Sequence, residues 1–87
     1  MNNWDDLRFF IELARSGSLS AAARILAVNH STVARRIGAF EKTHGIKLFN
    51  RQPDGYQLTD AGEQIYTQAL SIEADNHAIE RLLYAGD

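Results

Sequence analysis

The sequence predicts a mainly α-helical domain, in which three short helices and a two-stranded hairpin precede one long helix. Three observations support this fold class. Apolar residues recur at helical spacing in three successive segments up to Thr43. A Pro-Asp-Gly sequence beginning at Pro53 then separates two short segments of strand character. After Thr59, a helical pattern without proline continues to Tyr84.

The first segment, residues 2–17, has the spacing of an amphipathic helix. Its apolar stripe contains Trp4, Leu7, Phe10, Ile11 and Ala14. Asn3 is a suitable N-cap, and Asp5 and Asp6 suit the positive end of the helix dipole. Gly17 is a suitable C-terminal stop. These signals predict a helix that ends at about residue 16.

The second predicted helix is short and rich in alanine. Ser20 is its expected N-cap, and the helix is expected to continue through Ala27. Ala22, Ala23 and Leu26 fall on its buried side, where the two small side chains allow another helix to approach closely. The third helix is therefore expected to pack against it.

The third helix is predicted over residues 30–43, with Asn29 as its cap and Gly45 as its stop. Its apolar stripe contains Val33, Ile37 and Phe40. Two helices joined by a tight connection, the second with a basic polar face, are typical of a helix-turn-helix. A plain three-helix core without a binding role is the alternative.

The next segment changes from helical to strand character. Residues 47–49 and 56–58 are strand candidates on either side of the turn sequence RQPDG. A hairpin directly after the third helix forms the wing of a winged helix-turn-helix. We therefore expect a winged helix-turn-helix domain over residues 1–58, followed by a separate helical segment over residues 59–87.

The last predicted helix covers residues 59–84, and Thr59 is its expected cap. One narrow seam with alternating spacings of 4 and 3 contains Ile65, Ala69, Ile72, Asn76, Ile79 and Leu83. The start of this seam can cover the domain's own core. A domain of this size has no surface that covers Ile79 and Leu83, so the rest of the seam predicts a homodimer.

The net charge of −2 conceals an uneven distribution along the chain. Residues 29–51 carry five cationic side chains and only one anionic side chain, Glu41, a local charge of +4. Residues 52–87 carry seven acidic residues and only Arg81, a local charge of −6. A polyanion responds to the local field, since screening limits its range to about 8 Å at physiological salt. The middle segment is therefore the candidate nucleic-acid surface.

Composition also excludes several classes of function. The chain has no cysteine, and its three histidines have no metal-ligand spacing. His30 and Ser31 are neighbours on a helix and point about 100° apart, so they do not form a catalytic pair. We expect no catalytic residue, metal or cofactor, and no membrane-spanning segment. The N-terminus does not resemble a signal peptide, which favours a cytoplasmic location.

The order of motifs resembles the N-terminal DNA-binding domain of LysR-type transcriptional regulators. The matching elements are FFxxLAxxGSLSAAA, LAVNHSTVARRI, GIKLFNR and LTDAG, in order and almost without gaps from Leu7 to Glu63. Residues 64–87 correspond by position to the family's linker helix. The resemblance implies a bacterial, nucleoid-associated regulator of a duplex DNA operator. It also implies antiparallel pairing of linker helices, and a small-molecule effector domain C-terminal to this chain, which we expect to be part of a longer protein.

The resemblance places the third helix in the major groove of DNA. His30, Ser31 and Thr32 occupy the family's base-reading turn, although His30 replaces the usual glutamine and Ala34 a frequent serine. A purely local capping role is the alternative for His30. From its position one turn further, Arg35 can reach guanine with a bidentate fork. Arg36 lies about 100° around the helix and is assigned to the DNA backbone. Solvated surface arginines are the alternative for both.

The remaining contacts are expected to contribute less to DNA binding. Arg51 at the base of the wing is assigned to phosphate, with an internal salt bridge as an equal alternative. Gln52 is expected to form weak hydrogen bonds, because the wing tip has no cation and one aspartate, Asp54. Ser20 can reach phosphate through a helix N-terminus, although plain capping is favoured. A winged helix that binds only protein is the main competing class, and the basic middle segment argues against it.

Overall fold

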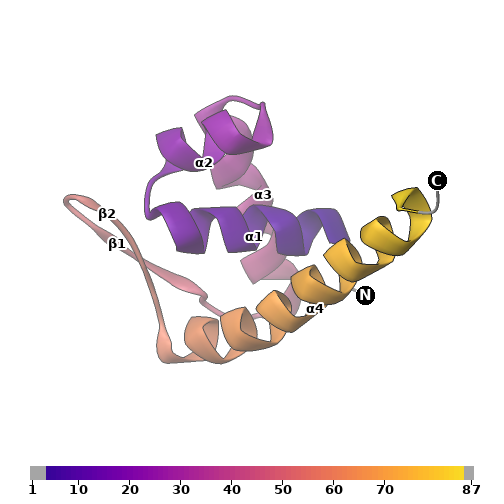
Figure 1. The fold of residues 1–87 in the computed structure, drawn as a ribbon. Helices are drawn as coiled ribbons and strands as arrows, with labels where there is room; N and C mark the ends of the chain where they lie inside the picture. Colours follow the sequence, from indigo (N-terminus) through magenta and orange to yellow (C-terminus); the bar gives the residue numbers. More distant parts are fainter. Residues whose placement is uncertain (1–3, 86–87) are drawn as a thin grey trace.

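The computed structural model describes residues 4–85, within which four helices surround a core and one antiparallel hairpin extends from it (Figure 1). The helices are α1 (Trp4–Ser16), α2 (Leu19–Leu26), α3 (His30–His44) and α4 (Asp60–Tyr84). Strands β1 (Phe49–Gln52) and β2 (Gly55–Leu58) lie between α3 and α4. This order confirms the predicted winged helix-turn-helix followed by a long helix. No helix in this part of the chain combines the length and apolarity needed to cross a membrane.

The predicted caps of the third and fourth helices and the predicted stop at Gly45 are confirmed, although α3 continues one residue beyond the predicted Thr43, to His44. The side chain of Asn29 accepts a hydrogen bond from the N–H of Thr32, and the side chain of Thr59 accepts one from the N–H of Gly62. Gly45 adopts the left-handed conformation at φ 62°, one residue beyond the last residue of α3. Gly17 likewise has a positive φ, 78°, directly after α1. The predicted cap of α1, Asn3, lies outside the described residues.

The predicted N-cap of the second helix is wrong. Ser18, not Ser20, has the extended backbone of a cap, and its Oγ accepts a hydrogen bond from Ala21 N at 3.1 Å. The reason is the left-handed turn at Gly17, which places the next residue at the helix entrance. Ser20 lies exposed inside the first turn of α2. The helix also ends one residue early, because Ala27 is a left-handed C-cap at φ 60°.

The predicted first strand, residues 47–49, is also wrong in its bounds. β1 begins at Phe49 and pairs with β2 in the register Phe49–Leu58 to Gln52–Gly55. Leu48 is unavailable to this ladder, because its N–H donates to the carboxylate of Glu41 and its carbonyl accepts from Thr59 N. The loop therefore contains only Pro53 and Asp54.

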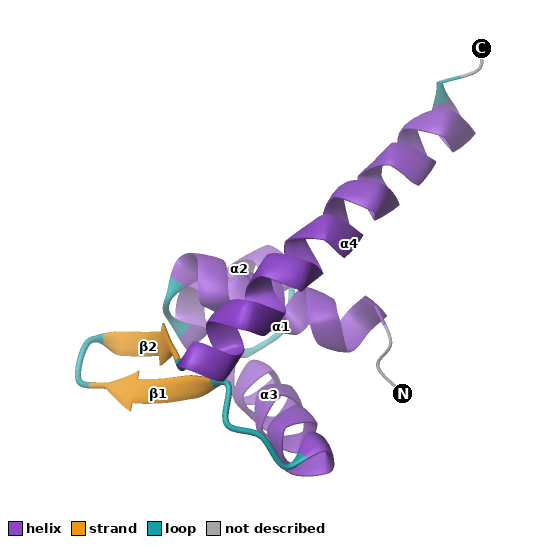
Figure 2. Cartoon of the chain, turned by 90° about the horizontal axis from the view of Figure 1, so that it is seen from below, coloured by secondary structure: helices purple, strands orange, loops and turns teal. Residues whose placement is uncertain are grey.

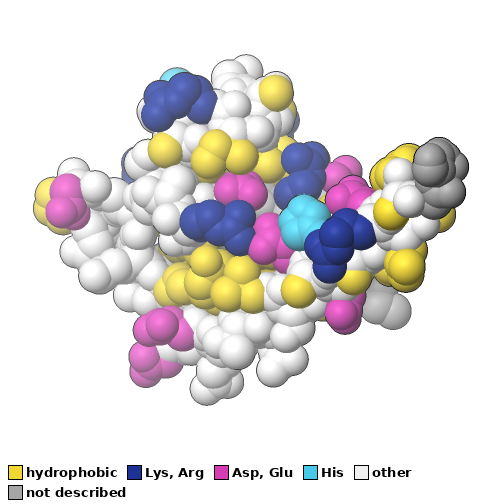
Figure 3. All heavy atoms as spheres, viewed as in Figure 1, with side chains coloured by type: hydrophobic (Ala, Val, Ile, Leu, Met, Phe, Trp, Pro, Cys, Tyr) yellow, Lys and Arg dark blue, Asp and Glu magenta, His cyan; other side chains and the backbone are white. Residues whose placement is uncertain are grey.

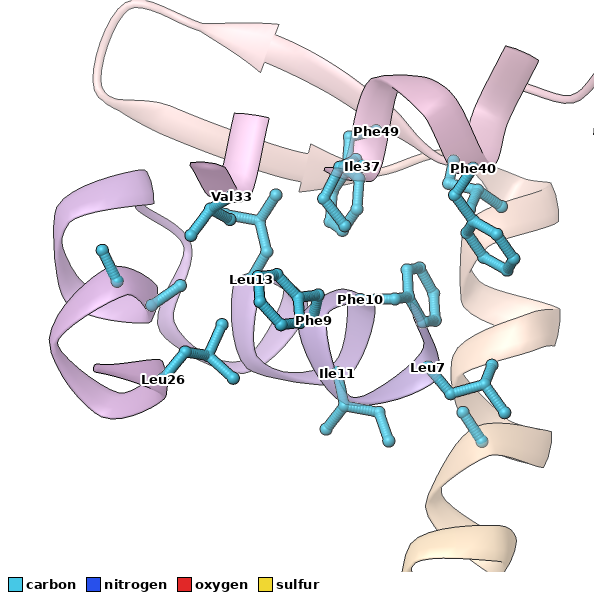
Figure 4. Close-up of a cluster of buried hydrophobic side chains, with 14 residues drawn as sticks. Leu7, Phe9, Phe10, Ile11, Leu13, Leu26, Val33, Ile37, Phe40 and Phe49 are labelled. Atoms are coloured by element: carbon cyan, nitrogen blue, oxygen red, sulfur yellow. The ribbon is translucent and has the colours of Figure 1, made fainter. Parts of the chain in front are cut away.

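The core lies around α1 (Figure 4). Its largest fully buried side chains are Phe10, Ile11, Leu13, Leu48 and Val33. Phe10 contacts the hairpin through Phe49, with ring centroids 5.5 Å apart. Figure 4 shows Leu13 next to Val33, which brings α1 and α3 together. The buried aromatic residues of α1, Phe9 and Phe10, thus serve packing.

Helix α4 begins against the body of the domain and then leaves it (Figures 1 and 2). Its first half is covered, since Ala69 is buried and Ile65 is packed against the core. Farther along, the predicted seam is open to solvent, with exposed fractions of 45% for Ile72, 55% for Ile79 and 67% for Leu83. The molecule is consequently elongated, 48 × 24 × 20 Å. The prediction that the start of this helix covers the domain's own core is confirmed.

Candidate nucleic-acid interface

The exposed face of α3 is polar and basic, and small residues lie beside its arginine. A helical turn of 3.6 residues aligns on this face the exposed residues Ser31, Arg35, Gly38 and Lys42. The opposite face is buried through Val33, Ile37 and Phe40. Ala34 and Gly38 flank Arg35 and are both exposed. Because these side chains are small, the α3 backbone can approach a surface closely around one long cation.

The first turn of α3 has a defined hydrogen-bond pattern. Asn29 Oδ1 accepts from Ser31 Oγ at 2.7 Å, from Thr32 Oγ1 at 3.0 Å and from Thr32 N at 3.0 Å. Both hydroxyl protons therefore point back toward Asn29. Their remaining lone pairs can accept hydrogen bonds, and the amino groups of adenine and cytosine are the donors in a major groove.

Arg35 and Arg36 have different environments. Arg35 is exposed, and within residues 4–85 it forms no ion pair. The guanidinium of Arg36 instead contacts α1, with Nη2 3.1 Å from Asp6 Oδ1. It also lies 4.5 Å from the centroid of the Phe9 ring. Arg36 thus joins α3 to α1, an internal role that sequence reasoning missed because Asp6 is distant in the chain.

A groove between the hairpin and the helices brings four predicted site residues together. Its helical side includes Ser20 and His30, and its hairpin side includes Arg51, Gln52 and Asp54. His30, the first residue of α3, is exposed at this groove. The groove therefore joins the N-terminal end of α3 to the wing, although the two are distant in sequence.

A second hollow, which shares Arg51 and Tyr56 with this groove, lies between α3 and the hairpin. Its lining includes Ala34, Gly38, Lys47, Arg51 and Tyr56. The guanidinium of Arg51 lies 5.7 Å from the centre of the Tyr56 ring, its cross-strand partner. Arg51 forms no ion pair with another described residue, so the alternative of an internal salt bridge is absent there. Tyr56 was missed as a site residue, and the correct hairpin register would have placed it opposite Arg51.

Two carboxylates lie at this surface: Glu41 lines the hollow along α3 and accepts the N–H groups of Leu48 and Phe49, and Asp54 lies at the hairpin tip. On the face shown in Figure 3, Asp and Glu side chains lie between α1 and α4, along α4 and at the hairpin tip. The tip residue is Asp54, in the two-residue loop. A carboxylate there opposes an approaching phosphate, so the hairpin tip is the weakest part of the basic surface.

The charged groups between α1 and α4 pair with one another. Arg15 Nη2 lies 2.6 Å from Glu73 Oε1, and Arg15 Nη1 lies 3.3 Å from Glu12 Oε2. The hydrogen bond to Glu73 is the main cause that raises the pKa of Arg15 above its ordinary value. The guanidinium of Arg15 therefore helps to hold α4 on α1. Among the described residues, no three His, Asp or Glu side chains are placed to share a metal ion.

Comparison with known proteins agrees with this geometry. Residues 4–63 match the family described as "Bacterial regulatory helix-turn-helix protein, lysR family". The activator TtdR of Escherichia coli K12 is 39% identical over 75 residues, covering 83% of this chain and 24% of that protein. The regulator TfdS of Cupriavidus pinatubonensis is 45% identical over 76 residues, covering 86% of this chain and 26% of that protein. The chain thus spans about a quarter of these relatives.

Solved structures show the same fold bound to DNA. The CbnR DNA-binding domain, crystallised as a DNA complex, matches with a TM-score of 0.81 and 30% identity over 99% of this chain and all of that chain. The BenM DNA-binding domain, bound to the benA site 1 DNA, matches with a TM-score of 0.86 at 22% identity, a likeness of fold alone. On the evidence of the family match and of these relatives, the chain belongs to the LysR family of bacterial helix-turn-helix transcriptional regulators.

Proposed function

We propose that this domain binds a specific duplex DNA site, with α3 in the major groove and the hairpin beside the neighbouring minor groove or backbone. The observation that carries the proposal is the exposed stripe of α3, where Arg35 projects between small side chains. A helix must enter the groove closely for its side chains to reach base edges. The DNA complex of the similar CbnR domain supports the same use of the fold.

The proposed roles follow from the surroundings of each residue. Arg35 reads guanine through its bidentate fork, and the hydroxyls of Ser31 and Thr32 accept hydrogen bonds from base amino groups. His30 contacts a base edge or phosphate at the end of the groove. Arg51 contacts phosphate from the outer half of the hairpin.

Four residues have lesser proposed roles. Gln52 and Ser20 line the groove and contribute weak polar contacts. Arg36 reaches the DNA backbone only if it leaves Asp6, so we expect its contribution to be smaller than that of Arg35. Lys42, at the far end of the α3 stripe, adds nonspecific attraction to phosphate.

We also propose that the domain is a homodimer through α4. Residues 1–58 then form the DNA-binding unit and residues 59–87 the pairing helix. The seam residues Ile65 and Ala69 are partly or fully covered within the chain, whereas Ile72, Ile79 and Leu83 are open. Asn76 lies among these open residues and would fix the register of the pair.

The whole protein is proposed to regulate transcription in the bacterial cytoplasm, at the nucleoid. A small-molecule effector would act through a further domain, because this chain spans only about a quarter of its relatives. The DNA-binding domain supplies the operator contacts in this arrangement.

Selection of bound sites from random duplex DNA tests the proposal. We expect two related half-sites and an affinity that falls steeply with salt. Arg35→Ala should weaken the selected site much more than a nonspecific duplex. Arg81→Ala, an exposed arginine on α4, is the matched control and should leave both affinities unchanged. An affinity that does not depend on salt, or equal losses for the two variants, would contradict the proposed interface.

A further inference from the structure

The backbone from Lys47 to Phe49, here called the 47–49 junction, is held from both sides. From α3, Glu41 Oε2 accepts the N–H groups of Leu48 at 2.7 Å and Phe49 at 3.1 Å. From the start of α4, Thr59 Oγ1 donates to the carbonyl of Lys47 at 2.7 Å, and Thr59 N donates to that of Leu48 at 3.0 Å. One short segment thus joins the recognition helix, the hairpin and the long helix.

The first turn of α4 touches this junction directly. A Cβ added at Gly62 would clash with the carbonyl oxygen of Leu48 and crowd the side chain of Leu58. Gly62 is helical and buried, a position at which alanine would otherwise favour the helix. Gly62 therefore allows the backbone of α4 to lie closer to the carbonyl of Leu48 than any residue with a Cβ would allow.

The junction cannot move independently of the core. Leu48 and Phe49 are buried, and Phe49 packs its ring against Phe10. A displaced carbonyl at Leu48 would therefore disturb close-packed side chains. Beyond the junction, α4 is attached to the body by the packing of Ile65, Tyr66 and Ala69 on the core. Three turns along, the ion pair of Arg15 with Glu73 adds a further attachment.

We propose that Glu41 and Gly62 are positioning residues that set the angle between α3 and α4, and through it the separation of the two recognition helices in the dimer. This inference rests on the proposed dimeric DNA binding, although neither residue needs to contact DNA. From Gly62 to Leu83, α4 extends about 32 Å. A tilt of about 5° at the junction would move its far end by about 3 Å, close to the rise of one base pair.

Spin-label distances test the angle without DNA. The chain has no cysteine, so Thr43→Cys on α3 and Ala74→Cys on α4, both exposed positions, give a unique label pair. The labelled chain is diluted with unlabelled chain, and only intrachain distances are measured. Gly62→Ala should shift the distance, and Glu41→Leu should broaden or shift its distribution. Glu41→Gln retains an acceptor oxygen and should restore the parent distribution.

A matched glycine variant controls for the substitution itself. Gly38 is also helical, but an added Cβ there meets nothing within 4 Å, so Gly38→Ala should keep the parent distance. Circular dichroism identifies any variant that does not fold, and Glu41→Leu and Gly62→Ala test the same angle independently. Parent-like distributions in the folded variants would overturn the inference.

The consequence for DNA is tested with duplexes that carry two selected half-sites at varied spacing. The parent chain should prefer one spacing, and Gly62→Ala should change that preference while its affinity for a single half-site stays within about twofold. A uniform loss at all spacings would refute the inference but leave the proposed dimer intact. A parent chain without any preferred spacing would refute the dimer and, with it, the inferred consequence for DNA.

Discussion

Replacing Ile79 in the open half of α4 should weaken the proposed dimer by a calculable amount. The side chain is 55% exposed in the single chain, and complete burial of an isoleucine contributes about 1.5–3 kcal/mol. Covering the exposed part contributes about 1 kcal/mol per copy, and a symmetric interface contains two copies. Ile79→Ala should therefore cost about 2 kcal/mol, a dissociation constant about 30-fold higher.

The assay is sedimentation velocity over a concentration series, which gives the dimer dissociation constant. Alanine is a better helix former than isoleucine, so unwinding of α4 would not explain a loss. Ile25→Ala is the matched control, since Ile25 is 60% exposed but lies on α2. Equal effects of the two substitutions would refute the reasoning, as would a parent chain that remains monomeric at tens of micromolar.

Three further predictions concern capping, the α1–α4 contact and the wing. Ser18→Ala should lower the free energy of unfolding in urea by about 1 kcal/mol, whereas Ser20→Ala should change it by less than about 0.5 kcal/mol, and the reverse order would disprove the assigned cap. A double-mutant cycle of Arg15→Met and Glu73→Gln should give a coupling of about 0.5 kcal/mol that falls in high salt, because Arg15 is well exposed. The pKa of Arg15 is higher in the folded chain than in the unfolded chain. The ion pair therefore contributes its full stability below the unfolded pKa, and this contribution is lost only as the pH rises through the folded pKa. Unfolding curves at pH 6 and pH 9 should therefore give the same coupling energy. Asp54→Asn should raise DNA affinity about twofold, by removing a like charge about 10 Å from phosphate, and fluorescence anisotropy showing a lower affinity would contradict a wing placed beside the DNA.

The helices were predictable because their signals are local. Asn29, Gly45 and Thr59 each act on residues within one turn, and the apolar spacing identified the buried faces of α1 and α3. The resemblance drawn from the motif order is confirmed by the family match, and membership in a family of regulators confirms that the chain is not an enzyme.

The error in the first strand arose because residues distant in sequence decide the outcome. Residues 47 and 48 have strand character, but Glu41 and Thr59 occupy their backbone groups. The error in the cap of α2 is local, because the left-handed turn at Gly17 makes Ser18 the N-cap in place of the predicted Ser20.

The residues of the candidate site also divide into those that local patterns predict and those whose surroundings depend on distant residues. Arg35 was assigned to the exposed face by helical periodicity alone. The partner of Arg36 is 30 residues away, at Asp6, and periodicity carries no information about it. The convergence of His30 with Arg51 and Gln52 depends on the three-dimensional position of the hairpin, which brings residues 51–56 to the same groove as residues 18–20 and His30. Their roles in DNA binding stay predictions.

The outer half of the hairpin is attached to the body through main-chain atoms, whereas its base is held by the buried ring of Phe49. Tyr56 N donates to the carbonyl of Gly17 at 2.8 Å, and Gly55 passes too close to that carbonyl for any side chain. Such an attachment does not depend on the side chains at Gln52, Pro53 or Asp54. Relatives within the family can therefore diverge at the tip, and exchange an acidic loop for a basic one, without rebuilding the support. Operator preference can in this way evolve separately from the stability of the fold.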